Sequence, residues 1–452
     1  MPGRGVKLRE WSMFIDYKEG TMQVEKLNKG TMDKLQENLL KRSPSQYGEY
    51  ETLVEDILNN VKLNGDAAVF QYTKMYDGFD VNQGNILVSE DEISKAYSEI
   101  DDELLEIIRR ALFNIREFHQ KQRQNSWFDV KDNGVILGQK VTPIQRVGVY
   151  VPGGKAVYPS SVLMNIVPAK IAGVDEIIMA SPPDRAGKIP STTLVAAIEA
   201  GVDRIYKIGG AQAIGALAYG TDTIPKIDKI VGPGNIYVAL AKRAVYGQVG
   251  IDSIAGPSEI LILADETANP KYVAADLLSQ AEHDELASSI LITTDEVLAE
   301  KVLVEIEKFM AILSRRDIIK ESLNNYGYIF IADNMEDAIL ATNEIASEHL
   351  QIMTKEPFEI MTRIRNAGAI FLGDYSSEPL GDYYAGPNHV LPTNGTAKFF
   401  SPLSVDDFVK KSSIISYSKE ALEMVHEDIE KFARAEELTA HENSIRVRFL
   451  PK

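Results

Sequence analysis

The stretch RIYKIGGAQAIGALA, residues 204–218, decides the fold. Residues 204–208 form a short strand-like run, two glycines follow, and residues 211–218 are expected to form a helix. The same order of strand, turn and helix recurs on both sides of this stretch. Strands are expected at 148–151, 176–180 and 229–231, and helices at 161–171, 192–200 and 236–244. Strict alternation of this kind predicts a parallel sheet covered by helices.

A second alternating set follows along the chain. Strands are expected at 259–264, 289–293, 328–331 and 369–372, with helices at 272–281, 298–312 and 335–346. The sequence therefore predicts an α/β protein with two lobes, in which the lobe of residues 150–258 is inserted into the other. Turns rich in Gly and Pro mark the breakpoints, namely YVPGG (150–154), VGPGN (231–235) and AGPSE (255–259).

The segments outside these lobes are expected to be mainly helical. Residues 1–40 are interpreted as short helices with polar connections, and further helices are expected at 44–75, 104–118 and 420–435. The predicted division has an N-terminal helical arm (1–40), a discontinuous first domain (41–149 and 259–380), a second domain (150–258) and a C-terminal loop and helix extension (381–452).

Composition excludes several classes of function. A net charge of −18 argues against a nucleic-acid surface, which needs a basic stripe, and also against an anionic membrane surface. The absence of cysteine excludes disulfides and thiolate chemistry and fits a reducing compartment, so a cytoplasmic location is expected. No stretch approaches the ~18 apolar residues that span a bilayer, and residues 1–20 lack the apolar core of a signal peptide.

Gln280 and His283 are the first candidates for chemistry. If both lie on one helix, their spacing puts them on the same face, where their polar ends can converge on one ion. A chain without cysteine must bind metal through nitrogen and oxygen, which suits zinc, with manganese or iron(II) as alternatives. The spacing alone equally fits a helix C-terminus with an exposed histidine, which the helix dipole favours.

Other polar residues suggest proton transfer. Glu348 and His349 place a carboxylate beside an imidazole, although the pair could also be a solvated helix end. Asp382 and His389 lie in GDYYAGPNHVLPT (381–393), a segment too rich in Gly and Pro for a predicted helix. His441 follows the last predicted helix. The remaining histidines, His119 and His426, are interpreted as surface residues.

A nucleotide site is suggested by glycine-rich turns after two predicted strands. No GxGxxG motif links a strand to a helix, but GGAQAIG (209–215) and GPGN (232–235) each precede a helix whose backbone N–H groups could receive phosphate. Ordinary tight turns would explain the same glycines. Because ligands of open α/β sheets bind at the carboxyl ends of strands, Tyr150, Gln212 and Asn235 are candidate contacts.

Several of these segments together resemble the histidinol dehydrogenase family, and their order and spacing agree from about residue 45 to the end. The matching segments are VGVYVPGG (147–154), GGAQAI (209–214), VGPGN (231–235), IDSIAGPSE (251–259), DLLSQAEH (276–283), SEHL (347–350), GDYYAGPNHVLPT (381–393) and LTAH (438–441). The resemblance implies two incomplete Rossmann-like domains with small extra domains. It also implies NAD-dependent oxidation of L-histidinol through bound L-histidinal to L-histidine, the last steps of histidine biosynthesis.

The resemblance also implies roles for individual residues and a homodimer with one zinc ion per subunit. The implied zinc ligands are Gln280, His283, Asp382 and His441, the last reaching the active site of the partner subunit. The implied catalytic pair is Glu348 and His349. The implied substrate contacts are Ser258, Gln280, His283, His349, Asp382, His389, Glu436 and His441, and the implied NAD contacts are Tyr150, Gln212 and Asn235.

These roles define a mechanism and its rivals. His349 is expected to act as general base on the alcohol, and Glu348 is expected to activate water for the aldehyde step. One rival is a zinc hydrolase that uses Glu348 as a base on water, and another is an NAD-dependent dehydrogenase of a different amino alcohol. A third is a metal-stabilised binding protein without catalysis. Only the dehydrogenases need a nucleotide site.

Overall fold

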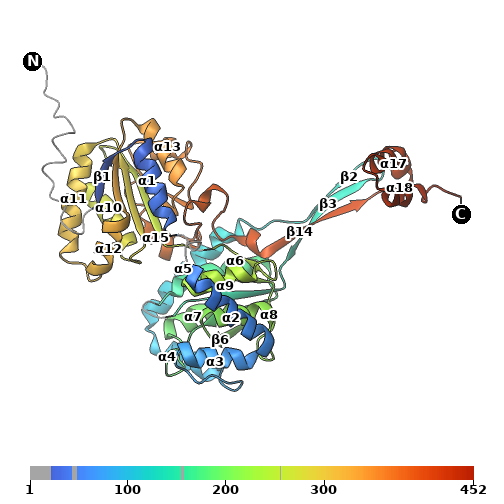
Figure 1. Ribbon diagram of the computed structural model, residues 1–452, viewed down its shortest axis with the longest axis horizontal. Helices are drawn as coiled ribbons and strands as arrows, with labels where there is room; N and C mark the ends of the chain where they lie inside the picture. Colours follow the sequence, from blue (N-terminus) through green and yellow to red (C-terminus); the bar gives the residue numbers. More distant parts are fainter. Residues whose placement is uncertain (1–21, 43–47, 154–156, 255, 452) are drawn as a thin grey trace, which may run out of the picture.

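The computed structural model describes residues 22–42, 48–153, 157–254 and 256–451. Two parallel sheets form the body of the molecule, and a three-stranded antiparallel sheet extends away from it (Figure 1). The strands of the larger parallel sheet, in spatial order, are β1 (Gln23–Lys26), β11 (Gly327–Ile331), β10 (Ser288–Thr293), β9 (Glu259–Ala264), β12 (His349–Met353) and β13 (Ala369–Leu372).

The smaller parallel sheet has five strands. In spatial order they are β6 (Arg204–Lys207), β5 (Glu176–Ser181), β4 (Arg146–Tyr150), β7 (Lys229–Val231) and β8 (Gly250–Ile251). Its crossover helices are α6 (Pro159–Ala172), α7 (Ser191–Ala200), α8 (Gly210–Tyr219) and α9 (Ile236–Val245). The predicted α/β class with two parallel sheets is confirmed. Strand β8 was not predicted, and the other strands and helices of this sheet match the expected ones to within a few residues.

Burial on both faces explains why the central strands have continuous apolar sequences. All six residues of β9, EILILA, are buried. Ile260 and Ile262 pack into the core on one face of the sheet, while Leu261 and Leu263 pack into the core on the other. Successive side chains of a strand point to opposite faces, so a strand with helices on both sides must be apolar throughout.

The helices that precede the second sheet require a correction to the predicted domains. They are α2 (Gly48–Asn64), α3 (Asp66–Tyr76), α4 (Glu90–Glu99) and α5 (Asp102–Gln120). Val54, Ile57 and Val61 of α2 share one core with Ile214 and Leu217 of α8. Strand β4 also lies in the centre of the five-stranded sheet. Much of segment 41–149 therefore packs with the second domain, because its apolar helix faces cover that sheet.

The beginning of the chain also differs from the expected short helices. Residues 1–21 of the predicted arm lie outside the described residues. Strand β1 pairs in parallel with β11, with Gln23 opposite Tyr328, and the helix α1 (Lys29–Leu40) follows it. The described N-terminal residues thus complete the six-stranded sheet, where the pairing of β1 with β11 satisfies the backbone groups along that edge of β1.

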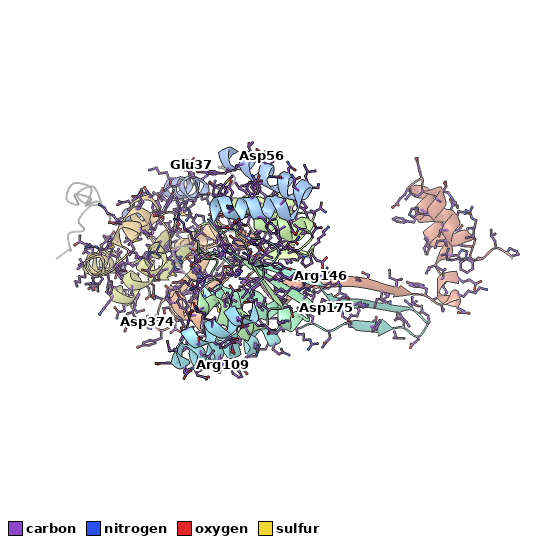
Figure 2. The ribbon with its side chains drawn as sticks, turned by 90° about the horizontal axis from the view of Figure 1, so that it is seen from below. Glu37, Asp56, Arg109, Arg146, Asp175 and Asp374 are labelled. Atoms are coloured by element: carbon purple, nitrogen blue, oxygen red, sulfur yellow. The ribbon has the colours of Figure 1, made fainter. Side chains whose placement is uncertain are left out.

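The antiparallel sheet was not expected from the sequence, which predicted only a loop and a helix after residue 375. Its strands are β14 (Val409–Ser416), β3 (Ile136–Pro143) and β2 (Trp127–Val130), and it leads to α16 (Lys419–Glu423), α17 (His426–Ala435) and α18 (Thr439–Arg446). We call this unit the arm, residues 127–143 and 409–446. It stands apart from the body in two perpendicular views (Figures 1 and 2). Trp127, Phe128 and Phe432 are exposed on it.

The remaining elements surround the six-stranded sheet and the pocket described below. They are α10 (Pro270–Ala281), α11 (Glu296–Met310), α12 (Arg316–Tyr326), α13 (Met335–Ile345), α14 (Pro357–Met361), α15 (Glu378–Tyr383) and the 3₁₀ turns η3 (Thr396–Lys398) and η4 (Val405–Phe408). Strand β12 and helix α12 were not predicted. Among the residues that the structure describes, no helix has the length and apolarity needed to cross a membrane.

The core of the six-stranded sheet gives a test of the fold. Replacing Ile262 with Ala should lower the free energy of unfolding by about 2–5 kcal/mol, because Ile262 is fully buried and the change leaves a cavity. Urea denaturation measures this change. The same replacement at Leu63, which is 81% exposed at the end of α2, should change the free energy of unfolding by less than about 0.5 kcal/mol. Equal effects of the two substitutions would contradict the assigned core.

Candidate active site between the two parallel sheets

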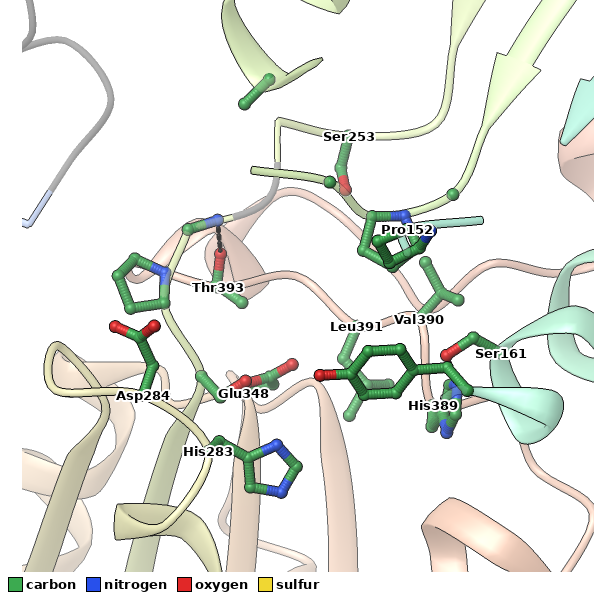
Figure 3. Close-up of a pocket in the computed structure, with 18 of the residues that line it drawn as sticks. Pro152, Ser161, Ser253, His283, Asp284, Glu348, His389, Val390, Leu391 and Thr393 are labelled. Carbon is green, nitrogen blue, oxygen red and sulfur yellow. Dashed lines mark hydrogen bonds between the residues drawn. The ribbon is translucent and has the colours of Figure 1, made fainter. Parts of the chain in front are cut away.

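A pocket of about 550 Å³ lies between the two parallel sheets. One wall follows the carboxyl end of β7, and the opposite wall is formed at the amino ends of β9 and β12. Figure 3 shows Glu348 and His283 on one side of this cavity and Ser161 and His389 on another. The predicted site residues that line it are Asn235, Ser258, Gln280, His283, Glu348, His349, Asp382 and His389.

Glu348 and His349 are held at the start of β12. Helix α13 ends at Ile345, and the φ of 53° at the next residue, Ala346, turns the chain sharply into the strand. Parallel pairing with β9 then places His349 opposite Ile260. The Glu259 N–H donates to the Glu348 carboxylate at 2.9 Å, and His349 Nδ1 lies 3.0 Å from the Glu259 carbonyl oxygen. Both side chains are buried, so the interpretation as a solvated helix end is wrong.

The hydrogen bond to the Glu259 carbonyl fixes the orientation of the His349 ring. Because a carbonyl oxygen only accepts, Nδ1 must carry the proton, and Nε2 is the nitrogen free to exchange one. Nε2 lies 3.7 Å from the Asp382 carboxylate. Glu348 and His349 can therefore present one proton-transfer nitrogen and one carboxylate to a bound molecule.

Burial and mutual charge shift the titration of both groups. Burial raises the pKa of Glu348 to about 8, although positive charge on His349 opposes the shift. Burial alone would depress the pKa of His349, but the Glu348 charge and the contact with Asp382 outweigh it and raise this pKa to about 10. The two groups thus stabilise each other's charge, which suits proton exchange within the pair.

A candidate metal centre adjoins this pair. The ligand atoms of His283, Glu378 and Asp382 lie within 4.8 Å of one another. Gln280 is fully buried beside them in the same pocket, and neither polar atom of its amide has a hydrogen-bond partner. A buried amide without partners is costly, and coordination by its oxygen would satisfy it. These residues fit a divalent metal ion with nitrogen and oxygen ligands.

Gln280 and His283 both line the pocket, but they do not lie on one helix. Helix α10 ends at Ala281, and His283 lies in the turn that follows. The residue is exposed at the edge of the pocket, yet the surrounding protein removes enough water to lower its pKa despite the opposing charge of Asp382. A neutral imidazole is the form that binds metal, so this shift favours a ligand role.

Glu378 is a member of the metal group that sequence analysis missed. It lies one helical turn before Asp382 in α15, so the expectation that residues 381–383 are not helical is wrong. Its carboxylate accepts a hydrogen bond from Ser279 at 2.9 Å, and burial raises its pKa to about 7. Against the effect of burial, contact with His349 and the nearby histidine charges lower the pKa of Asp382 to about 2.

His389 lies between Asp382 of the metal group and Ser161. Its Nε2 is 3.1 Å from the hydroxyl of Ser161 in α6, and its Nδ1 is 3.0 Å from the Asp382 carbonyl oxygen. Burial lowers its pKa, which keeps the ring neutral. Ser161, like Glu378, was not singled out from the sequence. Its only signal would be its place in the first turn of α6, the helix after the VGVYVPGG segment.

The residues expected to contact a nucleotide follow the carboxyl ends of three strands of the smaller sheet. The Tyr150 hydroxyl accepts from the Gly210 N–H at 3.1 Å. Gln212 is buried, and its amide nitrogen has no hydrogen-bond partner. Asn235 caps α9 by accepting from the Val238 N–H at 3.2 Å. Of these residues only Asn235 lines the pocket itself.

A buried ion pair holds the GPGN turn in place. Gly232 has a φ of 109°, and a Cβ at this position would lie 2.1 Å from the Tyr150 carbonyl oxygen, so only glycine fits. The Lys242 ammonium donates to the Gly232 carbonyl at 2.9 Å and pairs with the Asp252 carboxylate. That carboxylate in turn accepts from the Gly232 N–H at 2.7 Å. The turn that faces the pocket is therefore rigid.

The last predicted site residues lie far from this pocket. Glu436 follows α17 and His441 lies in α18, both exposed at the far end of the arm. Neither lines the pocket of its own chain (Figure 1). The surface interpretation of His119 is wrong, because the residue is fully buried and its Nδ1 lies 2.7 Å from the Gln122 amide oxygen. His426 is half-buried against Glu430.

Comparison with known proteins identifies the family. The sequence pattern of histidinol dehydrogenases matches residues 40–449. The chain belongs to the histidinol dehydrogenase family. The chain is 57% identical over 408 residues to the histidinol dehydrogenase of Caldanaerobacter subterraneus subsp. tengcongensis, covering 90% of this chain and 94% of that protein. It is 55% identical over 400 residues to the Bacillus subtilis enzyme, covering 88% and 93%.

A solved structure supports the same assignment. The crystal structure of histidinol dehydrogenase from Elizabethkingia anophelis aligns with a TM-score of 0.89 at 39% identity, covering 94% of this chain and 98% of that one. Membership in the histidinol dehydrogenase family makes this chain an oxidoreductase that acts on a CH–OH group. The zinc-hydrolase alternative and the non-catalytic alternative are not favoured.

The metal group gives a prediction that does not depend on turnover. Replacing Asp382 with Asn should weaken zinc binding by more than about tenfold, because an anionic ligand is lost. Competition with a chromophoric chelator measures this affinity. Glu285→Gln changes an exposed carboxylate two residues after His283 and should leave the affinity unchanged. Unchanged affinity of the Asp382 variant would exclude this metal centre.

Proposed function

We propose that this chain oxidises L-histidinol to L-histidine in two successive NAD-dependent steps, with L-histidinal held in the pocket between them. The observation that carries this proposal is the placement of a proton-transfer pair, a metal-ligand group and a glycine turn on the walls of one pocket. Membership in the histidinol dehydrogenase family names the reaction. A dehydrogenase of another amino alcohol needs the same parts, so the substrate itself must be tested.

Zinc would be held by Gln280, His283 and Asp382, with Glu378 supporting Asp382 from the same helix. The unpaired amide of Gln280 and the neutral form favoured at His283 support this ligand set. When bound, zinc would supply Lewis acidity and anchor the amine and imidazole of the substrate. Ser258 and His389 line the same pocket and would contact the substrate on either side.

His349 would move the protons of both steps. The Nδ1 of His349 is fixed on the Glu259 carbonyl, and the raised pKa of the ring means that Nε2 must first release a proton. The free Nε2 would then accept the proton of the alcohol while hydride leaves the carbinol carbon. When bound, NAD would supply the hydride acceptor for each step. The contact with Asp382 stabilises the imidazolium that forms and keeps the ring directed into the pocket.

Glu348 would act mainly in the second step, in which water must add to the aldehyde. Its carboxylate borders the pocket and is held by the Glu259 N–H through one oxygen, which leaves the other free. Its raised pKa makes it a stronger base than an ordinary carboxylate. After the hydrate forms, His349 would take a proton again and the second hydride would leave.

NAD would bind along the carboxyl ends of β4, β6 and β7, where Tyr150, Gln212 and Asn235 lie. The unpaired Gln212 amide nitrogen and the rigid turn at Gly232 support this site. Two hydride transfers require the first NADH to leave before the second NAD enters. A turn held open by Lys242 and Asp252 would keep its shape during this exchange.

The active protein would be a homodimer. His441 and Glu436 lie at the end of the arm, away from the pocket of their own chain, which supports their predicted entry into the partner subunit's site. The exposed apolar side chains of the arm fit burial against a second copy. His441 would then complete the nitrogen and oxygen ligand set of zinc in the other subunit.

The reaction predicts a fixed product ratio. We expect about two NADH per histidinol consumed, and loss of turnover when a chelator removes zinc. Absorbance of NADH combined with chromatography of histidine measures the ratio. A ratio of one with accumulation of the aldehyde would leave an ordinary alcohol dehydrogenase. Failure to form NADH from histidinol, with activity on another amino alcohol, would overturn the substrate assignment.

The division of labour between Glu348 and His349 can be tested with each half-reaction. His349→Asn should slow both oxidations by about 10²-fold or more, because both steps need its base. Glu348→Gln should slow histidinal oxidation far more than histidinol oxidation. Stopped-flow formation of NADH from each substrate separates the steps. Equal losses in both steps of the Glu348 variant would contradict its assignment to water activation.

The shared active site predicts complementation between inactive chains. A purified heterodimer of His349→Asn and His441→Asn chains should regain about half of the wild-type activity, because one of its two sites has both residues intact. Each variant homodimer serves as its own control and should be nearly inactive. A heterodimer no more active than the two homodimers would show that His441 does not act across the interface.

A further inference from the structure

Arg42 occupies an unusual position in the wall of the pocket. It follows α1 and is almost fully buried, yet it carries a charge that no proposed step uses. Its Nη2 pairs with the Glu259 carboxylate, and its Nη1 donates to the Leu286 carbonyl at 2.8 Å. The guanidinium also lies over the ring of Tyr326, with its carbon 5.3 Å from the ring centre. The charge is therefore fixed by three separate contacts.

The two hydrogen-bonding partners of Arg42, Glu259 and Leu286, lie beside groups with proposed roles in the site. Glu259 holds the catalytic pair with its main chain, through its N–H on Glu348 and its carbonyl oxygen against His349. Leu286 lies in the loop between α10 and β10 that carries His283, and it lines the pocket as well. One guanidinium thus joins the strand behind the proton-transfer pair to the loop behind the metal ligand.

We propose that Arg42 and Glu259 are a positioning pair for the active site, an inference that rests on the proposed roles of Glu348 and His283. The exposed fractions of the two side chains are 0% for Arg42 and 4% for Glu259. A buried carboxylate needs a cation, and the Glu259 carboxylate also lies close enough to Glu348 to oppose its ionisation. Arg42 neutralises that carboxylate and lets the Glu259 backbone stay in contact with the catalytic pair.

The geometry explains why arginine is used here. Its planar guanidinium can hold a carboxylate and a carbonyl oxygen at the same time while its face rests on an aromatic ring. Lysine would keep the charge but could not reproduce all three contacts. Removing the charge altogether would leave Glu259 buried without a counterion, and the strand would have to shift to hydrate it.

The test compares zinc-loaded wild-type protein with Arg42→Met, Arg42→Lys, Glu259→Gln and the double variant Arg42→Met/Glu259→Gln. The control is Arg146→Met, which breaks the 2.6 Å pair with Glu176 at the amino end of the smaller sheet, away from the pocket. The measured quantities are kcat for histidinol per folded zinc-loaded site, KM for NAD, and the rate of zinc loss to a chelator.

We expect Arg42→Met to lower kcat by about tenfold to a hundredfold and to speed zinc loss, because small displacements of catalytic groups are costly. KM for NAD should stay within about twofold. Arg42→Lys should retain more activity than Arg42→Met, and the double variant should lose less than the product of the two single losses. The Arg146 control should leave all three quantities unchanged.

Wild-type kcat and zinc retention in Arg42→Met, with only thermal stability reduced, would overturn the proposal and leave a structural ion pair. If Arg42→Met does not fold, Glu259→Gln and Arg42→Lys decide by the same measurements, since both keep the shape of the site. If the wild type forms no NADH from histidinol, the proposed function fails, while zinc retention still tests the positioning pair.

Discussion

The parallel pairing of β12 with β9 is the contact on which the site depends. It sets His349 opposite Ile260, so that the Glu259 residue just before can hold Glu348 with its N–H and His349 with its carbonyl oxygen. If the pairing of β12 with β9 shifted by one residue, the side chains of Glu348 and His349 would each point to the opposite face of the sheet. Strand β9 pairs with β10 over all six of its residues and with β12 over five, so its backbone hydrogen bonds are committed on both edges.

The site also depends on how the two sheets face each other. The proposed nucleotide contacts lie at carboxyl ends of strands, as ligands of open α/β sheets usually do, whereas Glu348 and His349 lie at the amino ends of the larger sheet. The pocket between them therefore receives a rigid glycine turn from one domain and charged side chains from the other. Because those side chains are buried, water screens their charges less than at a surface, and the interactions between these charges are stronger. Unpaired polar atoms at Gln280 and Gln212 mark the points where a metal and a nucleotide would complete the structure.

The sequence predicted most strands and helices of both sheets because continuous apolar runs between glycine turns have few alternatives. It missed β12, whose run HLQIM includes Gln351, a buried amide that donates to Asp276 at 2.9 Å. Only the packed structure shows that the amide nitrogen of this residue is paired. Glu378 was missed because the nearby Gly and Pro residues hid a short helix. Arg42 could not be found, since its partner Glu259 lies 217 positions away and no local pattern links them. A helix was predicted at 420–435 in the arm, but its antiparallel sheet was missed, because all four residues of β2 are exposed and apolar and polar faces do not alternate.

In the proposed dimer, two chains would build each catalytic centre around one zinc ion beside the Glu348–His349 pair. Crystals grown with zinc, measured by anomalous diffraction at the zinc edge, test it most directly. We expect one zinc peak per subunit, in contact with Gln280, His283, Asp382 and His441 of the partner subunit. We also expect His349 Nδ1 to remain against the Glu259 carbonyl oxygen. A zinc peak away from Gln280 and His283, or a complete ligand set drawn from a single chain, would contradict it.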